Sequence, residues 1–388
     1  MSVVSNIVLS SRVRRSPYFA ATQRYGCKAY SVYNHMYLPL YYESPEADYW
    51  HLVNGVTLWD VAVERQVEIV GPDAARLVQR LSPRDLSSCA VGQCKYVMMT
   101  DARGGIVNDP VLLKLAEDRF WLSLADSDVL LWAKGIALAG GYDVEVFEPD
   151  VSPLQLQGPL AAAVGEALFG AALNDLKYFR FAEFDLDGMP LIVSRTGWSG
   201  ERGYEIYLQN GADGDRLWEV IMEAGRPHGI KPATPSTIRR IEGGLLSYGA
   251  DMTLENNPYE MNLGRLIDLE QEADFIGKAS LARIAQDGVR QRLVGLIIEG
   301  GRETTAGLER AAVVRDGQAV GRVTSVAYSP RLEQTIALCL VTAEYSAEGT
   351  VLTVQPEGQL EGQLEGKTRA SVRNASVSPL PFVTKKTV

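Results

Sequence analysis

Apolar and polar positions alternate along several short stretches in the middle of the chain, a pattern typical of half-buried strands. Gln66 to Val70 shows this alternation, and Val111 to Leu115 and Phe120 to Leu124 are apolar runs on either side of a polar turn. Leu191 to Val193 and Tyr204 to Leu208 repeat the arrangement across a glycine-rich turn. The pattern predicts antiparallel strands joined by short turns.

Helical spacing of apolar residues between these stretches predicts four helices. We expect them over residues 73–83, 128–140 and 215–223, and from residue 236 onward. Gly140-Gly141 can end the second helix. The fourth helix is expected to carry Ile238, Ile241, Leu245 and Leu246 on one side.

After about residue 285 the helical spacing fades and short apolar runs return. These runs are Leu293 to Ile298, Ala319 to Val326, Thr335 to Val341 and Thr350 to Val354. Several short strands at such intervals predict an all-β unit. The overall expectation is therefore an α+β chain with a small β-barrel at its C-terminal end.

A chain of 388 residues is too long for one ordinary core, so two or three packed units are expected. The net charge of −10 disfavours nucleic acid and membrane as partners, because an acidic surface repels phosphate backbones and anionic lipids. The sequence has no run of about 18 apolar residues, and Met1 to Arg15 lacks the apolar stretch of a signal peptide. We therefore expect a cytoplasmic protein.

Cysteine and histidine usage argues against metal and hydrolase chemistry. Cys27, Cys89, Cys94 and Cys339 are scattered without metal-ligand spacing, which is typical of reduced thiols. The sequence has three histidines and no His-x-x-His pair, so we expect no metal site. A serine or cysteine hydrolase is also disfavoured, because its nucleophile needs a histidine close by and the sequence has only three.

Asp109 is the first candidate for chemistry. It follows Lys95-Tyr96 and the turn Gly104-Gly105, and it precedes the apolar strand that starts at Val111. A carboxylate at the mouth of such a strand is partly desolvated, which suits a group placed near a basic or cationic nitrogen. On spacing alone, a turn aspartate held by backbone amides explains the same residue.

The second candidate segment, Ser194 to Tyr207, contains three glycines spaced by two residues. It fails the dinucleotide fingerprint, because a strand follows the glycines in place of a helix. Glu205 and Tyr207 lie on one face of that strand. A carboxylate beside an aromatic ring suits a flat heterocycle with N–H donors, such as a pterin. The alternative is a hairpin with a solvated glutamate.

The third candidate segment runs from Thr237 to Gly249 and carries Arg239 and Arg240 next to an apolar helix face. Adjacent guanidinium groups can orient a carboxylate or lock a domain interface. A solvated basic patch on a surface helix explains the same pair.

Together these segments resemble the aminomethyltransferase (T-protein) family. The resemblance lies in Asp109 after Gly104-Gly105, in the block Ser194 to Ile206, and in Arg240-Ile241-Glu242-Gly243-Gly244. Asp274 to Lys278 and Tyr328 to Arg331 extend it in the family order. The resemblance therefore covers most of the chain.

The resemblance implies an α+β fold of three domains, arranged as a cloverleaf around a central tetrahydrofolate site. Residues 1–60 and 150–245 correspond to the folate-binding domain, residues 61–149 and 246–285 to a second α+β domain, and residues 286–388 to the C-terminal β-barrel. The folate site carried over by motif consists of Tyr96, Asp109, Trp198, Glu205, Tyr207 and Arg240.

Within this family the chain is similar to the branch that demethylates small sulfonium compounds such as dimethylsulfoniopropionate. Trp198 stands where the glycine-cleavage branch has tyrosine. Tyr33, His35 and Trp198 are the expected contacts of the methyl donor, since aromatic faces attract a soft cation. His35 stands where the sulfonium branch has a lysine, so the exact donor stays open.

The implied reaction transfers a methyl group to N5 of tetrahydrofolate and leaves a neutral thioether. It needs alignment and no enzyme nucleophile, and Asp109 is the residue expected to offset charge at N5. Other donors stay open: a methylamine, an aryl methyl ether or the aminomethyl-lipoyl protein. In a different class, a folate-binding assembly factor for iron–sulfur proteins is disfavoured, because its Lys-Gly-Cys motif is absent. The oligomeric state, a homodimer included, stays open.

Overall fold

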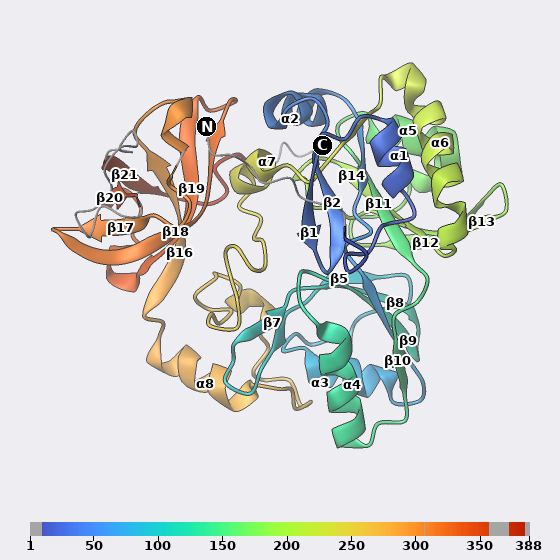
Figure 1. Cartoon of the computed structure of the whole chain (residues 1–388). Helices are drawn as coiled ribbons and strands as arrows, with labels where there is room; N and C mark the ends of the chain where they lie inside the picture. Colours follow the sequence, from blue (N-terminus) through green and yellow to red (C-terminus); the bar gives the residue numbers. More distant parts are fainter. Residues whose placement is uncertain (1–9, 306, 357–371, 385–388) are drawn as a thin grey trace.

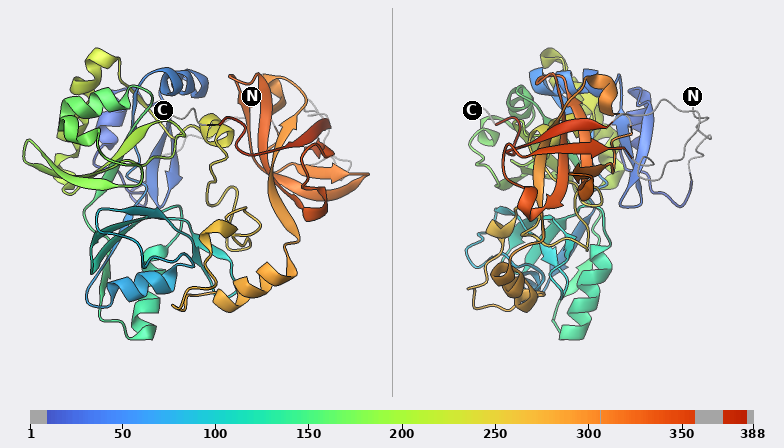
Figure 2. Two further views of the ribbon diagram at one scale, coloured as in Figure 1. Left: turned by 180° about the vertical axis from the view of Figure 1, so that it is seen from behind. Right: turned by 90° about the vertical axis from the view of Figure 1, so that its left-hand side faces the viewer.

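The computed structural model describes residues 10–305, 307–356 and 372–384, so most of the N-terminal segment behind the localisation expectation lies outside the described residues. A six-stranded sheet, a five-stranded sheet and a closed six-stranded barrel make up three lobes. Figure 1 shows the lobes around a common centre, and Figure 2 shows the same arrangement from behind and from one side. The predicted α+β class with a C-terminal barrel is confirmed.

The first lobe is built on the six-stranded sheet, here called the first sheet, with strand order β12-β13-β14-β11-β3-β15. All its pairings are antiparallel except that of β15 with β3. The lobe consists of β1 (Ala29–Tyr33), β2 (Met36–Tyr41), β3 (Thr57–Asp60), β11 (Ser152–Gln157), β12 (Phe181–Leu186), β13 (Met189–Ser194), β14 (Gly203–Leu208), β15 (Lys231–Ala233), α1 (Phe19–Arg24), α2 (Pro45–Asn54), α5 (Ala161–Phe169) and α6 (Gly214–Gly225). Leu217, Trp218 and Ile221 of α6 enter its core, as the amphipathic spacing predicts.

The second lobe is built on the five-stranded antiparallel sheet, here called the second sheet, with order β10-β4-β9-β8-β5. It consists of β4 (Gln66–Val70), β5 (Cys94–Tyr96), β6 (Met99–Thr100), β7 (Ile106–Asn108), β8 (Val111–Ala116), β9 (Arg119–Ser123), β10 (Glu145–Phe147), α3 (Ala74–Leu81) and α4 (Val129–Gly140). The chain crosses from the first sheet to the second through residues 61–65, between β3 and β4. The expected domain boundaries stay a prediction.

The barrel closes in the order β16-β19-β18-β17-β20-β21. Its strands are β16 (Gln291–Ile298), β17 (Ala312–Arg315), β18 (Gln318–Ser329), β19 (Gln334–Thr342), β20 (Val351–Gln355) and β21 (Arg373–Ser378), and α8 (Lys278–Asp287) precedes them. Short 3-10 turns cover Ala171–Leu173, Gly211–Asp213, Arg226–His228, Gly264–Leu266, Arg302–Thr305 and Ala343–Tyr345. In the described residues no helix is long and apolar enough to cross a membrane.

One predicted helix is shorter than expected. The helix α7 (Thr237–Glu242) starts at the Ser236 cap, whose hydroxyl accepts a hydrogen bond from the Arg239 N–H. It ends at Glu242 because Gly244 has a φ of 64° and reverses the backbone. Leu245 and Leu246 therefore leave the helix, which corrects their predicted place on its apolar face.

A buried ion pair joins the segment after the first sheet to the barrel. The Arg240 Nη1 atom lies 2.6 Å from the Asp251 Oδ2 atom, and both side chains are buried. Thr324 and Ser325 of β18 each donate to Asp251 Oδ1 at 2.6 Å. In Figure 1 the helix α7, which carries Arg240, lies between the barrel and the first lobe. The ion pair therefore fixes the position of the barrel.

We predict that Asp251→Ala lowers the free energy of unfolding by about 3–5 kcal/mol, because it leaves the Arg240 guanidinium buried without its charge partner. Chemical denaturation measures the loss. The matched control is Glu223→Ala, which removes an exposed ion pair with Arg226 and should change stability little. Equal stability of the two variants would contradict the assignment.

Candidate functional site

A cavity of about 720 Å³ opens where the two sheets and the segment after α7 meet. This volume is in the range of small-molecule sites. Its walls come from the β1–β2 hairpin, residues 61–65, β5, the start of β8, the loop 196–198 and residues 235–248. Of the residues singled out in the sequence, Tyr33, Tyr96, Asp109, Trp198, Glu205 and Arg240 line it.

Glu205 lies in the cavity wall within a dense set of hydrogen bonds. It belongs to β14, where its register partners are Gln155 of β11 and Ser194 of β13. The Gln155 Nε2 atom donates to Glu205 Oε1 at 2.7 Å, and the Tyr207 hydroxyl donates to Oε2 at 3.0 Å. Thr196 also donates to Oε2. Burial raises the pKa of Glu205, and these donors act against the increase.

Tyr207 lies behind Glu205 and outside the cavity lining. Its hydroxyl bonds to Glu205, as expected for residues two apart on one strand face, while its ring packs against Trp121 with a centroid distance of 6.1 Å. Tyr207 therefore holds Glu205 in place through its hydroxyl and joins the two sheets through its ring.

Asp109 lies between β7 and β8 with an unused acceptor atom. Pairing of Tyr96 with Val111 brings the Tyr96 ring next to it, and the Tyr96 hydroxyl donates to Asp109 Oδ2 at 2.8 Å. The Oδ1 atom is buried and has no partner among the described residues. Burial raises the pKa of Asp109 to about 7, and the Tyr96 hydrogen bond acts in the opposite direction. The carboxyl group therefore titrates near neutral pH.

Trp198 and Arg240 form an adjoining wall. The Trp198 indole donates to the Leu246 carbonyl at 3.2 Å, and the Arg240 guanidinium carbon lies 5.8 Å from the Trp198 ring centre. The loop that carries Trp198 requires its glycines, because a Cβ atom at Gly197 or Gly203 would lie within 2.4 Å of the buried Gln157 amide. These glycines therefore allow close packing and form no phosphate-binding loop.

The β1–β2 hairpin separates Tyr33 from His35. Asn34 and His35 have φ values of 47° and 62°, so they form the two central positions of a tight hairpin turn. Asn34 donates to the Val63 and Ala125 carbonyls at 3.0 and 2.9 Å, which holds Tyr33 against the cavity. His35 is exposed at the tip and lies 3.4 Å from Asp128. The structure thus places His35 outside the cavity lining.

Sequence reasoning missed four residues of this site: Glu64, Gln155, Thr196 and Arg84. Glu64 lies in the crossing between the two sheets, and Thr196 and Gln155 hold Glu205. Arg84 lines the cavity and donates to the Tyr96 carbonyl at 2.7 Å. Glu64 and Gln155 carry no sequence signal, because Gln155 reaches Glu64 and Glu205 across 91 and 50 residues, whereas Thr196 lies inside the block Ser194 to Ile206 and could have been singled out there.

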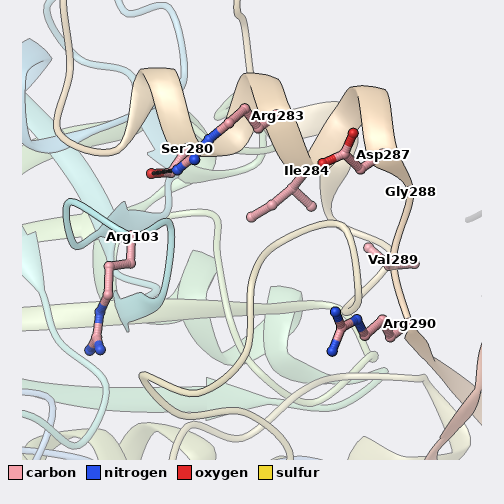
Figure 3. A pocket seen from close by; sticks show the side chains of 8 residues that line it. All are labelled: Arg103, Ser280, Arg283, Ile284, Asp287, Gly288, Val289 and Arg290. Atoms are coloured by element: carbon pink, nitrogen blue, oxygen red, sulfur yellow. Dashed lines mark hydrogen bonds between the residues drawn. The ribbon is translucent and has the colours of Figure 1, made fainter.

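A second hollow of about 480 Å³ lies beside α8 and shares no lining residue with the cavity. Figure 3 shows its residues spread over α8, the turn that carries Arg103 and the segment that follows α8. Arg103 pairs with Asp101 at 3.3 Å, and no group of metal-binding side chains occurs within the described residues. The central cavity is therefore the candidate site.

Two domain families match the chain: the GCVT N-terminal domain over residues 18–271 and the glycine cleavage T-protein C-terminal barrel domain over residues 291–383. A dimethylsulfoniopropionate demethylase of Ruegeria pomeroyi is 44% identical, with 92% of this chain and 97% of that protein covered. An aminomethyltransferase of Bacillus subtilis is 32% identical, with 88% and 95% covered.

A solved structure shows the same fold. It is the glycine cleavage system aminomethyltransferase T from Bartonella henselae, which superposes with a TM-score of 0.82 at 24% identity. The match covers 96% of this chain and 99% of that one.

We predict that Tyr96→Phe raises the pKa of Asp109 above its value of about 7, because it removes the hydrogen bond that favours the ionised carboxylate. Carbon-13 NMR of labelled aspartate, with the Asp109 signal assigned by its loss in Asp109→Asn, measures the titration. Tyr248→Phe is the control, since the Tyr248 hydroxyl bonds to the Ile106 carbonyl. A pKa that stays or falls in Tyr96→Phe contradicts the prediction.

Proposed function

The chain belongs to the glycine cleavage T-protein family, and from this membership we propose that it is a tetrahydrofolate-dependent demethylase. Its proposed substrate is a small sulfonium compound like dimethylsulfoniopropionate, and its products are 5-methyltetrahydrofolate, a thioether and the proton that N5 loses. The observation that carries this proposal is the 44% identity to a dimethylsulfoniopropionate demethylase over 92% of the chain.

The cavity fits a reduced folate ring. Asp109 lines the cavity, and its buried Oδ1 atom has no partner among the described residues, so an N–H group of a ligand would satisfy it. We propose that Tyr96, Asp109, Trp198, Glu205 and Arg240 surround the folate, with Tyr207 holding Glu205. Bound tetrahydrofolate supplies the N5 atom that accepts the methyl group.

Asp109 is the proposed catalytic residue. Its pKa of about 7 allows the carboxyl group to exist in either protonation state near neutral pH. An ionised Asp109 offsets positive charge that develops next to it, and a neutral one can hold a proton. Tyr96 orients the carboxyl group through Oδ2 and leaves the buried Oδ1 without a partner among the described residues.

The methyl-donor side is proposed to consist of Tyr33 and Trp198. Both rings line the cavity, and aromatic faces attract a sulfonium without fixing it as a counter-ion does. His35 is left out of this side because its ring is exposed at the hairpin tip. A cytoplasmic location completes the proposal and is supported by the four free cysteines.

The aminomethyl-lipoyl reaction is the second candidate, and its support is weaker. The aminomethyltransferases of Bacillus subtilis and Streptomyces avermitilis are 32% and 33% identical, compared with 44% for the demethylase. Incubation of the purified protein with tetrahydrofolate and each donor separates the two. Mass detection of 5-methyltetrahydrofolate only with the sulfonium donor supports the demethylase, and product from the aminomethyl donor alone overturns it.

We predict that Asp109→Asn lowers kcat by roughly 10²–10³-fold, the scale of losing one preorganised electrostatic contact. Folate and donor affinities should change little, because the charge that Asp109 offsets appears in the transition state. Steady-state kinetics and calorimetry test both parts. Near-normal kcat at saturating folate and donor removes Asp109 from the mechanism.

A further inference from the structure

Glu64 is an acidic residue of the cavity wall to which the proposed reaction assigns no role. It lies at the crossing between β3 and β4, in a turn closed by a 2.9 Å hydrogen bond from its N–H to the Val61 carbonyl. Its side chain lines the cavity together with Asp109 and Glu205. Three residues with carboxyl groups therefore line one cavity.

Gln155 connects Glu64 to Glu205. Its Nε2 atom donates to Glu205 Oε1 at 2.7 Å and to Glu64 Oε1 at 3.3 Å, so the two hydrogens of one amide serve two carboxylates. The shorter bond goes to Glu205. Glu64 receives the weaker one, together with a hydrogen bond from Ser123.

The two glutamates differ in the acceptor capacity that they have left. An ionised carboxylate offers about four acceptor sites. Glu205 uses three of them for Gln155, Thr196 and Tyr207, and it has Ser194 as a further neighbour. Glu64 uses less of its acceptor capacity, because its hydrogen bond from Gln155 is long. Glu64 is thus the glutamate with more free acceptor sites toward a ligand.

The surroundings of Glu64 disfavour its ionised form. Burial first, and then the Glu205 and Asp109 carboxylates, raise the pKa of Glu64 well above its usual range. The charged groups that raise this pKa are thus both acidic. N–H donors supplied by a ligand would relieve this cost.

We propose that Glu64 is a second folate-binding carboxylate, which accepts N–H groups of the reduced pterin ring that the hydrogen-bonded Glu205 cannot accept. This inference rests on the proposed function. A tetrahydropterin carries N–H donors on N3, N5, N8 and its amino group, more than one largely occupied carboxylate can accept. Because burial raises the pKa of Glu64 and N–H donors of a ligand favour its ionised form, binding should lower this pKa and release protons.

Calorimetry of tetrahydrofolate binding in two buffers of different ionisation enthalpy tests the inference. In Glu64→Gln we expect an affinity lower by at least about ten-fold, the effect of losing a charge-assisted hydrogen bond. We also expect fewer protons released on binding than in the unmutated protein. Glu223→Gln, at an exposed position, is the control and should match the unmutated protein.

Thermal unfolding of the ligand-free protein gives an independent measurement. Because the pKa of Glu64 is higher in the folded protein than in the unfolded chain, ionising Glu64 destabilises the fold. This destabilisation is absent at pH values below the pKa in the unfolded chain, and it is complete at pH values above the pKa in the folded protein. The Tm of Glu64→Gln relative to the unmutated protein should therefore rise with pH. Glu64→Leu, which also removes the charge, should show the same direction.

The outcomes separate this inference from the proposed function. No binding of tetrahydrofolate by the unmutated protein overturns both. If the unmutated protein binds tetrahydrofolate and Glu64→Gln shows the same affinity and proton release, the role of Glu64 is overturned and the proposed function stands. If Glu64→Gln lowers the affinity for the methyl donor and leaves the affinity for folate unchanged, the role of Glu64 in folate binding is overturned as well. Loss of ligand-free stability in both Glu64 variants makes Glu64 a structural group and also overturns it.

Discussion

The buried guanidinium group of Arg240 is the constraint on which the shape of the site depends. A cation at this depth requires a partner, since an unpaired buried charge strongly destabilises the fold. Asp251 and Ser325 provide that partner, and Ser325 belongs to barrel strand β18. Barrel and first lobe are therefore held in one relative position. Trp198 stacks over the same guanidinium group, so one wall of the cavity follows from this pairing.

The cavity lining also contains three carboxyl groups, which are stabilised to different degrees. Strand neighbours satisfy Glu205, Tyr96 satisfies one oxygen of Asp109, and Glu64 depends on a long bond from Gln155 and on Ser123. Acidic groups that are buried at a cost in stability are typical of a site that binds complementary groups. The three carboxyl groups therefore favour a ligand rich in N–H donors, which is the chemistry proposed for the folate ring.

The sequence predicts those parts of the structure that depend on neighbouring residues. Alternation alone placed β4 at Gln66–Val70, and the spacing of two placed Glu205 and Tyr207 on one face. The predicted end of α7 was wrong, because the backbone turns at Gly243-Gly244 although apolar residues follow at helical spacing. Glu64 could not be predicted, since its partner Gln155 is 91 residues away and only the sheet register brings them together.

The proposed folate side and the proposed donor side of the site lie on elements that differ in how many neighbouring strands constrain them. Glu205 lies on β14, which is paired on both edges, so a shift there disturbs the whole first sheet. Tyr33 lies on β1, which pairs only with β2 among the described strands and is anchored through Asn34. Substitutions in this hairpin should therefore alter the proposed donor side without moving the proposed folate side. The proposed donor side and the proposed folate side therefore rest on different elements of the fold, the hairpin with the Trp198 loop on one side and the first sheet on the other.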